Sequence, residues 1–168
     1  MSHALIPGSF DPMTLGHLDL IKRVKDYYDK VTVAVMLNES KTYAHTLAER
    51  ADMAKLTLAG LSGVEVVTDK GLLVDLFDRI GADVIVKGIR CEEDRLYEEK
   101  MAAWNLAHNP RAKTAFLHAS EEFEHISSTL VREYLKAGRV PNGLLAPNVI
   151  DYLRAMGELP ASGEDVAP

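Results

Sequence analysis

The regular alternation of short apolar runs with longer helical patterns is the feature that most constrains the fold of this sequence. The runs are rich in β-branched residues, which is typical of strands buried on both faces, and they lie at 4–6, 31–35, 64–67, 84–86 and, more weakly, 114–117. Helical periodicity is found at 16–28, 47–58, 72–80, 94–108, about 127–137 and 148–156. This order predicts an α/β fold: a five-stranded parallel sheet with right-handed crossovers and helices on both faces.

Length and composition favour one domain and exclude several classes of protein. The 168 residues, 47% of them hydrophobic, suit a single domain at 1–157 followed by a flexible C-terminal tail at 158–168. A net charge of −6 argues against a general nucleic-acid or acidic-membrane surface. The single cysteine, Cys91, excludes an intrachain disulfide and suits a reducing interior. Because we find neither a signal segment nor an apolar run that approaches the length of a membrane span, we expect a cytoplasmic protein.

The loop after the first strand is the leading candidate site, because ligands of parallel α/β sheets bind beyond the carboxyl ends of the strands. Pro7 and Pro12 stop regular structure, and Gly8 lets the backbone approach a ligand. The helix that begins near His17 points its free N–H groups and positive dipole end at this loop. The loop therefore predicts a phosphate site with a histidine beside it, although a lone histidine near a helix start is more often structural or solvated.

Basic residues follow two other strands. Lys41 comes after the second strand, where it is either a phosphate anchor or a solvated surface lysine. After the fourth strand, Lys87 and Arg90 flank Gly88 and can bracket a polyphosphate, with a solvated turn as the alternative. The next segment, 91–94, is strongly acidic and would partly neutralise these cations. Either a salt-bridge network or a controlled anion site follows from this pattern.

Three consecutive hydroxyl residues, Ser127, Ser128 and Thr129, stand where a late helix begins. One side chain is enough to satisfy the N2 or N3 donor, so a simple cap explains Ser127. It leaves Ser128 and Thr129 without a task. Surplus hydroxyls together with free helix N–H groups suit phosphate oxygens, so this helix start is a second candidate phosphate site.

Other kinds of site find no support in the sequence. The six histidines show no zinc-like pairing with the cysteine or with one another, so we expect no protein-held metal. Walker A and dinucleotide-binding fingerprints are absent. Neither the cysteine nor Ser9 sits in a recognisable nucleophile motif, so the chain has no obvious nucleophile.

Two ordered motifs at opposite ends of the chain give it a family resemblance. Residues 14–17 match the Thr/His-x-Gly-His motif, and residues 126–132 match the Ile-Ser-Ser-Thr-x-x-Arg motif, of the nucleotidylyltransferase superfamily. Within that superfamily the chain most closely resembles the bacterial phosphopantetheine adenylyltransferase family, over about residues 5–156. The resemblance implies a single-domain Rossmann-like nucleotidylyltransferase fold. The segments that carry the closer likeness are 7–12, Lys41, 46–50, 71–75 and 87–90.

The resemblance also implies an activity. The adenylyl group of ATP would pass to the phosphate of 4′-phosphopantetheine and give dephospho-coenzyme A and pyrophosphate, the penultimate step of coenzyme A biosynthesis. The implied mechanism is direct in-line attack on the α-phosphorus, with positioning and charge stabilisation supplying catalysis. Magnesium would arrive on the triphosphate. A homohexamer and feedback binding of coenzyme A are implied as well.

The family motifs assign roles to individual residues. By resemblance, His17 stabilises the transition state, while Ser9 and Lys41 hold the acceptor phosphate in line. Leu73 and Lys87 would contact the pantetheine substrate. The residues that would hold ATP are Ser9, Phe10, His17, Gly88, Ile89, Arg90, Glu98, Phe123, Glu124, His125, Ile126, Ser127, Ser128 and Thr129.

The sequence departs from the family pattern at Arg95 and Leu96. That helix start lies near the acceptor and a subunit contact in the family, so the departure bears on acceptor selectivity, feedback and assembly. One alternative is a sister enzyme that acts on nicotinamide mononucleotide, or on a phosphorylated alcohol with CTP; Lys41 and segment 71–75 argue against it. Another is a noncatalytic nucleotide-binding sensor. The presence of His17, Lys41 and Arg90 together argues against it, because binding alone does not need an in-line phosphate clamp.

Overall fold

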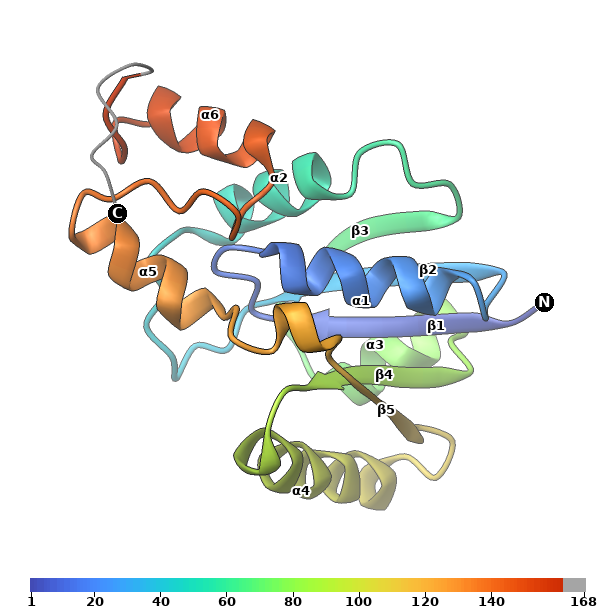
Figure 1. Ribbon diagram of the computed structural model, residues 1–168. Coiled ribbons are helices and arrows are strands. Elements are labelled where there is room, and N and C mark those ends of the chain that lie inside the picture. Colours follow the sequence, from blue (N-terminus) through green and yellow to red (C-terminus); the bar gives the residue numbers. More distant parts are fainter. Residues whose placement is uncertain (162–168) are drawn as a thin grey trace.

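The five predicted strands form one fully parallel sheet in the order β3-β2-β1-β4-β5 (Figure 1). The computed structural model describes residues 1–161. Its strands are β1 (His3–Gly8), β2 (Lys30–Met36), β3 (Val64–Asp69), β4 (Val84–Ile89) and β5 (Thr114–His118). Its helices are α1 (Leu15–Lys25), α2 (Leu47–Thr57), α3 (Leu73–Ile80), α4 (Glu92–His108), the 3-10 turn η1 (Glu121–Phe123), α5 (Ser128–Lys136) and α6 (Pro147–Ala155). The predicted α/β class is confirmed.

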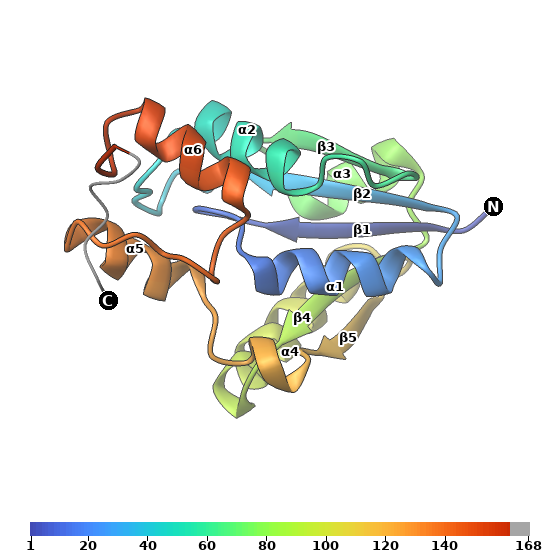
Figure 2. The ribbon, with the colours of Figure 1, turned by 45° about the horizontal axis from the view of Figure 1, so that its top comes forward.

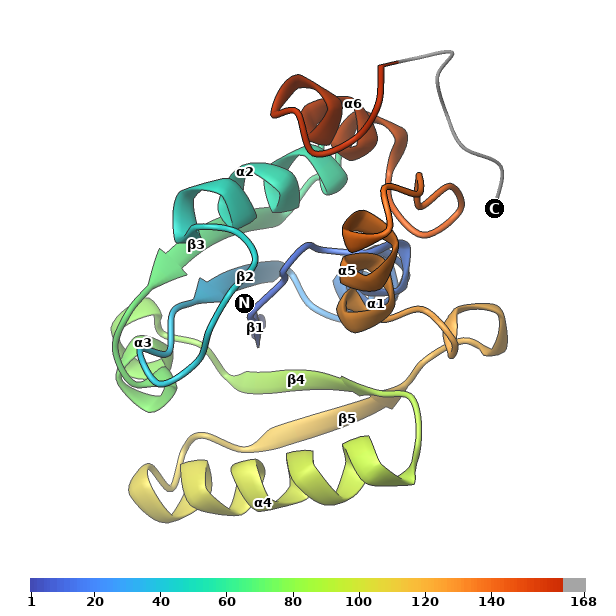
Figure 3. The same cartoon turned by 90° about the vertical axis from the view of Figure 1, so that its left-hand side faces the viewer.

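Helices cover both faces of the sheet, as the alternation predicts. The alternating side chains of β1 divide the core: Ala4 and Ile6 pack against α1 and α2, whereas Leu5 packs against α3. Seen along the sheet, α1 and α3 lie on opposite faces, and α4 runs below β4 and β5 (Figure 3). Burial on both faces accounts for the nearly continuous apolar runs in the sequence.

The strand order makes β1 the central strand of the sheet, with β4 beside it. β1 pairs with β2 on one side and with β4 on the other, so the chain reverses its direction of winding at β1 and β4. In open α/β sheets, ligands bind at such a switch point, beyond the carboxyl ends of the strands. The loops after these two strands, which carry the candidate site residues, therefore lie where the topology favours a ligand.

The last two helices form a third apolar cluster beyond the carboxyl ends of the strands. α5 lies across that end of the sheet, and α6 lies beside α2 (Figures 1 and 2). Buried Val131, Ile150 and Leu153 belong to this cluster with Met53 of α2. Among residues 1–161, no helix is long and apolar enough to cross a membrane.

Of the element boundaries that differ from the expectations, those of the C-terminal segment and of α4 have clear physical reasons. The tail expected at 158–168 begins with residues that pack onto the domain: Leu159 is buried in the α5–α6 cluster, and the Glu158 carboxylate bonds His45. Residues 162–168 lie outside the described part of the chain. α4 begins at Glu92, two residues earlier than expected, because Cys91 is extended and three acidic residues occupy the first turn, where the helix dipole favours them.

Candidate active site

The second family motif, at 126–132, is joined by direct hydrogen bonds to the loop that precedes the first motif, at 14–17. The Ser128 hydroxyl of α5 donates to the Pro12 carbonyl at 2.8 Å. From the same helix, the Arg132 guanidinium donates to the Asp11 carbonyl at 2.9 Å. Both acceptors lie in the β1–α1 loop. The loop and the start of α5 therefore form one unit at the switch point.

His17 has one ring nitrogen engaged in a helix cap and the other available to a ligand. Its Nδ1 atom accepts the backbone N–H of Thr14 at 3.0 Å, and the Thr14 hydroxyl accepts the backbone N–H of His17 at 3.3 Å. This reciprocal capping box begins α1. Because Nδ1 accepts, the proton of the neutral ring is on Nε2. Within residues 1–161 no protein group bonds that Nε2 atom.

Burial and neighbouring charges keep the His17 ring neutral. Burial lowers its pKa, and the positive charges of Lys87 and Arg90 lower it further, to about 4. The Phe10 ring packs edge-on against the imidazole, with centroids 5.0 Å apart. At neutral pH, His17 is therefore a fixed hydrogen-bond donor through Nε2 and not a proton source.

The two glycines expected to let a ligand approach, Gly8 and Gly88, also make room for protein side chains. A Cβ on Gly8 would lie 2.7 Å from the Phe10 ring, and one on Gly88 would lie 2.9 Å from a Leu20 methyl group. Phe10 itself has φ 49° and is 5% exposed. This left-handed backbone is strained for an aromatic residue, so the packing around the ring must hold it.

The β4 end forms the salt-bridge network that was one of the two expected arrangements. Lys87 Nζ lies 3.3 Å from Glu98 Oε2, and Arg90 Nε lies 3.1 Å from Asp94 Oδ2. The Asp94 carboxylate also accepts the backbone N–H of Arg90. Although they are paired, Lys87 and Arg90 still contribute positive charge that lowers the pKa of His17. Lys41 lies on the exposed loop after β2 and has no ion pair within the described part of the chain.

All three hydroxyls at the start of α5 have partners. Ser127 is the N-cap, and its side chain accepts the Leu130 N–H at 3.0 Å, as expected. Ser128 bonds Pro12, and the Thr129 hydroxyl accepts from the Arg132 guanidinium at 3.1 Å. The second and third hydroxyls are therefore not without a task inside the protein. Their protein bonds orient them, and each oxygen keeps further hydrogen-bonding capacity.

Comparison with known proteins identifies the family. A family described as cytidylyltransferase-like matches residues 5–134, more than half of the chain. A protein of Limosilactobacillus reuteri (strain DSM 20016), named phosphopantetheine adenylyltransferase, is 44% identical over 154 residues that cover 92% of this chain and 89% of its own. Proteins with the same name from Limosilactobacillus fermentum and Symbiobacterium thermophilum are each 42% identical, over 92% of this chain and 90% and 95% of theirs. The chain belongs to the phosphopantetheine adenylyltransferase family.

The remaining residues that the family resemblance assigns to ligands surround the same end of the sheet. Leu73 is half-buried at the first position of α3. Glu98 lies nearly two turns into α4 and pairs with Lys87. The residues between η1 and α5 divide into exposed and buried positions: Glu124 pairs with His118 at 2.9 Å, His125 is exposed, Phe123 is half-buried and Ile126 is buried.

Sequence reasoning assigned no role to three residues that hold the phosphopantetheine adenylyltransferase site together: Asp11, His45 and Arg50. Asp11 is 3% exposed and accepts the N–H groups of Ala44 and His45 and a ring nitrogen of His45. Burial opposes its charge, but these bonds hold the pKa of the carboxyl below its usual value. The flanking prolines marked Asp11 as part of a special loop, but no local signal pointed to a partner more than thirty residues away.

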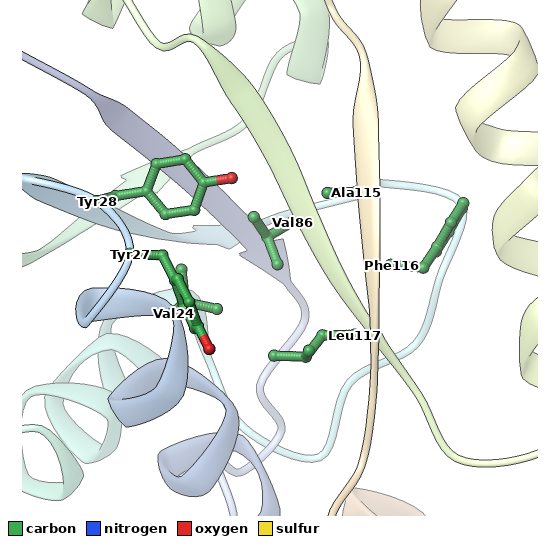
Figure 4. Close-up of a pocket in the computed structure, with 7 residues that line it drawn as sticks. All are labelled: Val24, Tyr27, Tyr28, Val86, Ala115, Phe116 and Leu117. Atoms are coloured by element: carbon green, nitrogen blue, oxygen red, sulfur yellow. The ribbon is translucent and has the colours of Figure 1, made fainter.

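A small apolar pocket lies outside this site. It opens between the end of α1 and strands β4 and β5, at the opposite end of α1 from His17 (Figure 4). Its lining residues are Val24, Tyr27, Tyr28, Val86, Ala115, Phe116 and Leu117. Because none of them carries a charge, the pocket lacks the groups that a phosphate ligand needs.

Proposed function

We propose that this chain transfers the adenylyl group of ATP to 4′-phosphopantetheine, forming dephospho-coenzyme A and pyrophosphate. The single observation that carries this proposal is the His17 ring. Its Nδ1 atom is held by the Thr14 N–H, and its Nε2–H is free at the N-terminus of α1, where anions are favoured. A neutral, fixed donor at that place suits the charge that develops on a phosphoryl group during transfer.

The proposed reaction is an in-line displacement. An oxygen of the acceptor phosphate attacks the α-phosphorus of ATP, a new P–O bond forms, and the bond from that phosphorus to the pyrophosphate oxygen breaks. The pyrophosphate leaves with its electron pair. Such a reaction needs positioned charges and no covalent nucleophile on the enzyme, in keeping with a site built from cations, a neutral imidazole and helix N-termini.

Each side chain has a proposed task in this reaction. The His17 Nε2–H donates to an α-phosphate oxygen and stabilises the transition state. Ser9 and Lys41 hold the acceptor phosphate, and Leu73 and Lys87 contact the pantetheine arm. The remaining residues would hold ATP: Phe10, Gly88, Ile89, Arg90, Glu98 and the loop from Phe123 to Thr129. The position of Ser9 and Lys41 after the adjacent strands β1 and β2 supports a shared ligand.

Magnesium enters this proposal as part of the ATP substrate. Among residues 1–161, no group of three histidine, cysteine or carboxylate side chains could hold a metal ion. The candidate phosphate site contains Lys41, Lys87 and Arg90, whose charges suit phosphate oxygens and repel a bare cation. Bound to the triphosphate, magnesium would neutralise charge on the leaving pyrophosphate.

Assembly, regulation and location are proposed on the strength of the family. We propose a cytoplasmic homohexamer with feedback binding of coenzyme A. One face of α4 supports a subunit contact: Tyr97, Met101 and Trp104 are spaced as neighbours on a helix, and each is at least 40% exposed. The exposed thiol of Cys91 supports a reducing compartment.

The activity is tested by incubating the protein with ATP, magnesium and 4′-phosphopantetheine and measuring both dephospho-coenzyme A and pyrophosphate. We expect the two products in equal amounts. Parallel reactions with nicotinamide mononucleotide, and with glycerol 3-phosphate plus CTP, should give neither product above background. Turnover of either alternative, or no product with 4′-phosphopantetheine, would contradict the proposal.

A further inference from the structure

The buried guanidinium of Arg50 contacts three separate segments of the site. Arg50 is 0% exposed, although it carries a full positive charge. Its Nη1 atom donates to the Ser9 carbonyl at 2.7 Å and to the Met36 carbonyl at 2.9 Å. Its Nε atom donates to the His45 carbonyl at 3.2 Å. One side chain of α2 thus connects the end of β1, the end of β2 and the residue before the N-cap of α2.

These bonds fix a loop at both of its ends. Met36 and His45 bracket the segment 37–44, which carries Lys41, and the third acceptor belongs to Ser9. The ring of Tyr43, from the same segment, lies over the guanidinium, 3.9 Å from Cζ. The guanidinium of Arg50 therefore holds the backbone of Ser9 and both ends of the Lys41 loop in fixed positions relative to one another.

Core stability alone does not explain a charged residue at this place. Burying a cation has a desolvation cost, and hydrogen bonds to neutral carbonyl groups compensate for it only in part. The buried Nη2 atom finds no hydrogen-bond partner among residues 1–161, which adds to that cost. The planar fork of an arginine holds its donors in fixed directions toward several carbonyls, whereas the ammonium of a lysine rotates on a flexible stem. A buried arginine at this position is therefore better explained by a need to place the loop accurately than by core stability.

We propose that Arg50 is a positioning residue for the acceptor phosphate. It sets the separation between Ser9 and Lys41 and thereby places the attacking oxygen in line with the α-phosphorus. This inference rests on the proposed function, because it assigns Ser9 and Lys41 to the acceptor. Arg50 itself touches neither substrate.

The test compares wild type with Arg50→Lys and with the control Arg111→Lys. Arg111 is also an arginine that donates to a backbone carbonyl, that of Ala82, and lies near an aromatic ring, that of Phe77. We expect Arg50→Lys to lower kcat/KM for 4′-phosphopantetheine by about 100-fold, as small misplacements of reacting groups do, with KM for ATP within about twofold of wild type. Arg111→Lys should match wild type. Equal losses for both substrates would overturn the positioning role.

A double-mutant cycle separates positioning from general damage. If Arg50 acts through Lys41, then Arg50→Lys should cost little further activity in a Lys41→Ala background. Additive losses would show that the two residues act independently and would contradict the proposal. If wild type itself gives no product, the proposed function fails; if wild type and Arg111→Lys are active and the cycle is additive, only the inference about Arg50 fails.

Thermal unfolding shows whether Arg50→Lys folds. If it does not fold, a second variant, Tyr43→Leu, tests the same proposal. Tyr43→Leu leaves the guanidinium in place but removes its aromatic cover and the hydroxyl that accepts the Asn38 N–H. We expect KM for 4′-phosphopantetheine to rise by about threefold with KM for ATP unchanged. An unchanged KM for the acceptor in a folded Tyr43→Leu protein would overturn the inference.

Discussion

His45 Nδ1 lies 2.9 Å from Asp11 Oδ1, and the opposite ring nitrogen, Nε2, lies 2.8 Å from Glu158 Oε1. A buried imidazole thus bridges a carboxylate of the β1–α1 loop and a carboxylate that follows α6. The hydrogen bond with Asp11, and then that with Glu158, raise the pKa of His45 against the opposing effect of burial. The bridge connects the phosphate loop to the C-terminal segment.

This bridge predicts a pH-dependent stability. Because the folded-state pKa of His45 lies above its unfolded value of 6.5, the stabilisation is complete below that value and is lost as the pH rises through the folded pKa. Glu158→Gln should therefore lower the free energy of unfolding by about 1–3 kcal/mol near about pH 5.5 and by less at an alkaline pH above the folded pKa of His45. Urea unfolding at both pH values measures this, with exposed Glu122→Gln as the control. A penalty that does not shrink at the higher pH would contradict the charged bridge.

Gly8→Ala should destabilise the protein and damage the site together. The new Cβ would lie 2.7 Å from the Phe10 ring, and that ring packs against His17. We expect a loss of about 1–3 kcal/mol, as for other overpacked positions, with a fall in kcat. Gly71→Ala is the matched control, since its nearest neighbour would lie at an ordinary 3.5 Å. Thermal unfolding and initial rates measure both effects, and equal behaviour of the two variants would argue against the packing role of Gly8.

Ser128→Ala should loosen the junction between the second motif and the β1–α1 loop. The variant loses the bond to the Pro12 carbonyl, for which we expect a loss of about 1 kcal/mol of stability and a higher KM for ATP. Thr129→Ser keeps its hydroxyl and should behave as wild type. An unchanged KM for ATP in Ser128→Ala would show that the bond between Ser128 and Pro12 does not contribute to ATP binding.

The ring of His17 should be observed as a neutral imidazole with its proton on Nε2. With a pKa of about 4, it should show no protonation at about pH 6, where a free histidine is largely charged. Nitrogen NMR of the imidazole side chains reports both the charge and the tautomer, and the spectrum of a His17→Gln variant assigns the signal. A charged ring, or a proton on Nδ1, would conflict with the observed bond from the Thr14 N–H.

The sequence predicted the fold because its signals are local. Apolar runs and helical periodicity located all five strands, and the two motifs located the ends of the site. The bonds that give the site its shape are not local: Asp11 meets His45 across 34 positions, and Ser128 meets Pro12 across 116. No pattern in one sequence marks such partners. The packing role of Gly8 could not be predicted either, because its neighbour, the ring of Phe10, takes its place only through a left-handed backbone.

The turnover of His17→Ala, measured beside its affinity for ATP, tests the central claim most directly. We expect kcat to fall by about 100-fold to 1,000-fold, as when one donor to a transition-state oxygen is removed, while the dissociation constant for ATP stays within about threefold of wild type. Retained folding is checked by thermal unfolding. If kcat is unchanged, His17 does not stabilise the transition state, and the proposed adenylyl-transfer mechanism is contradicted.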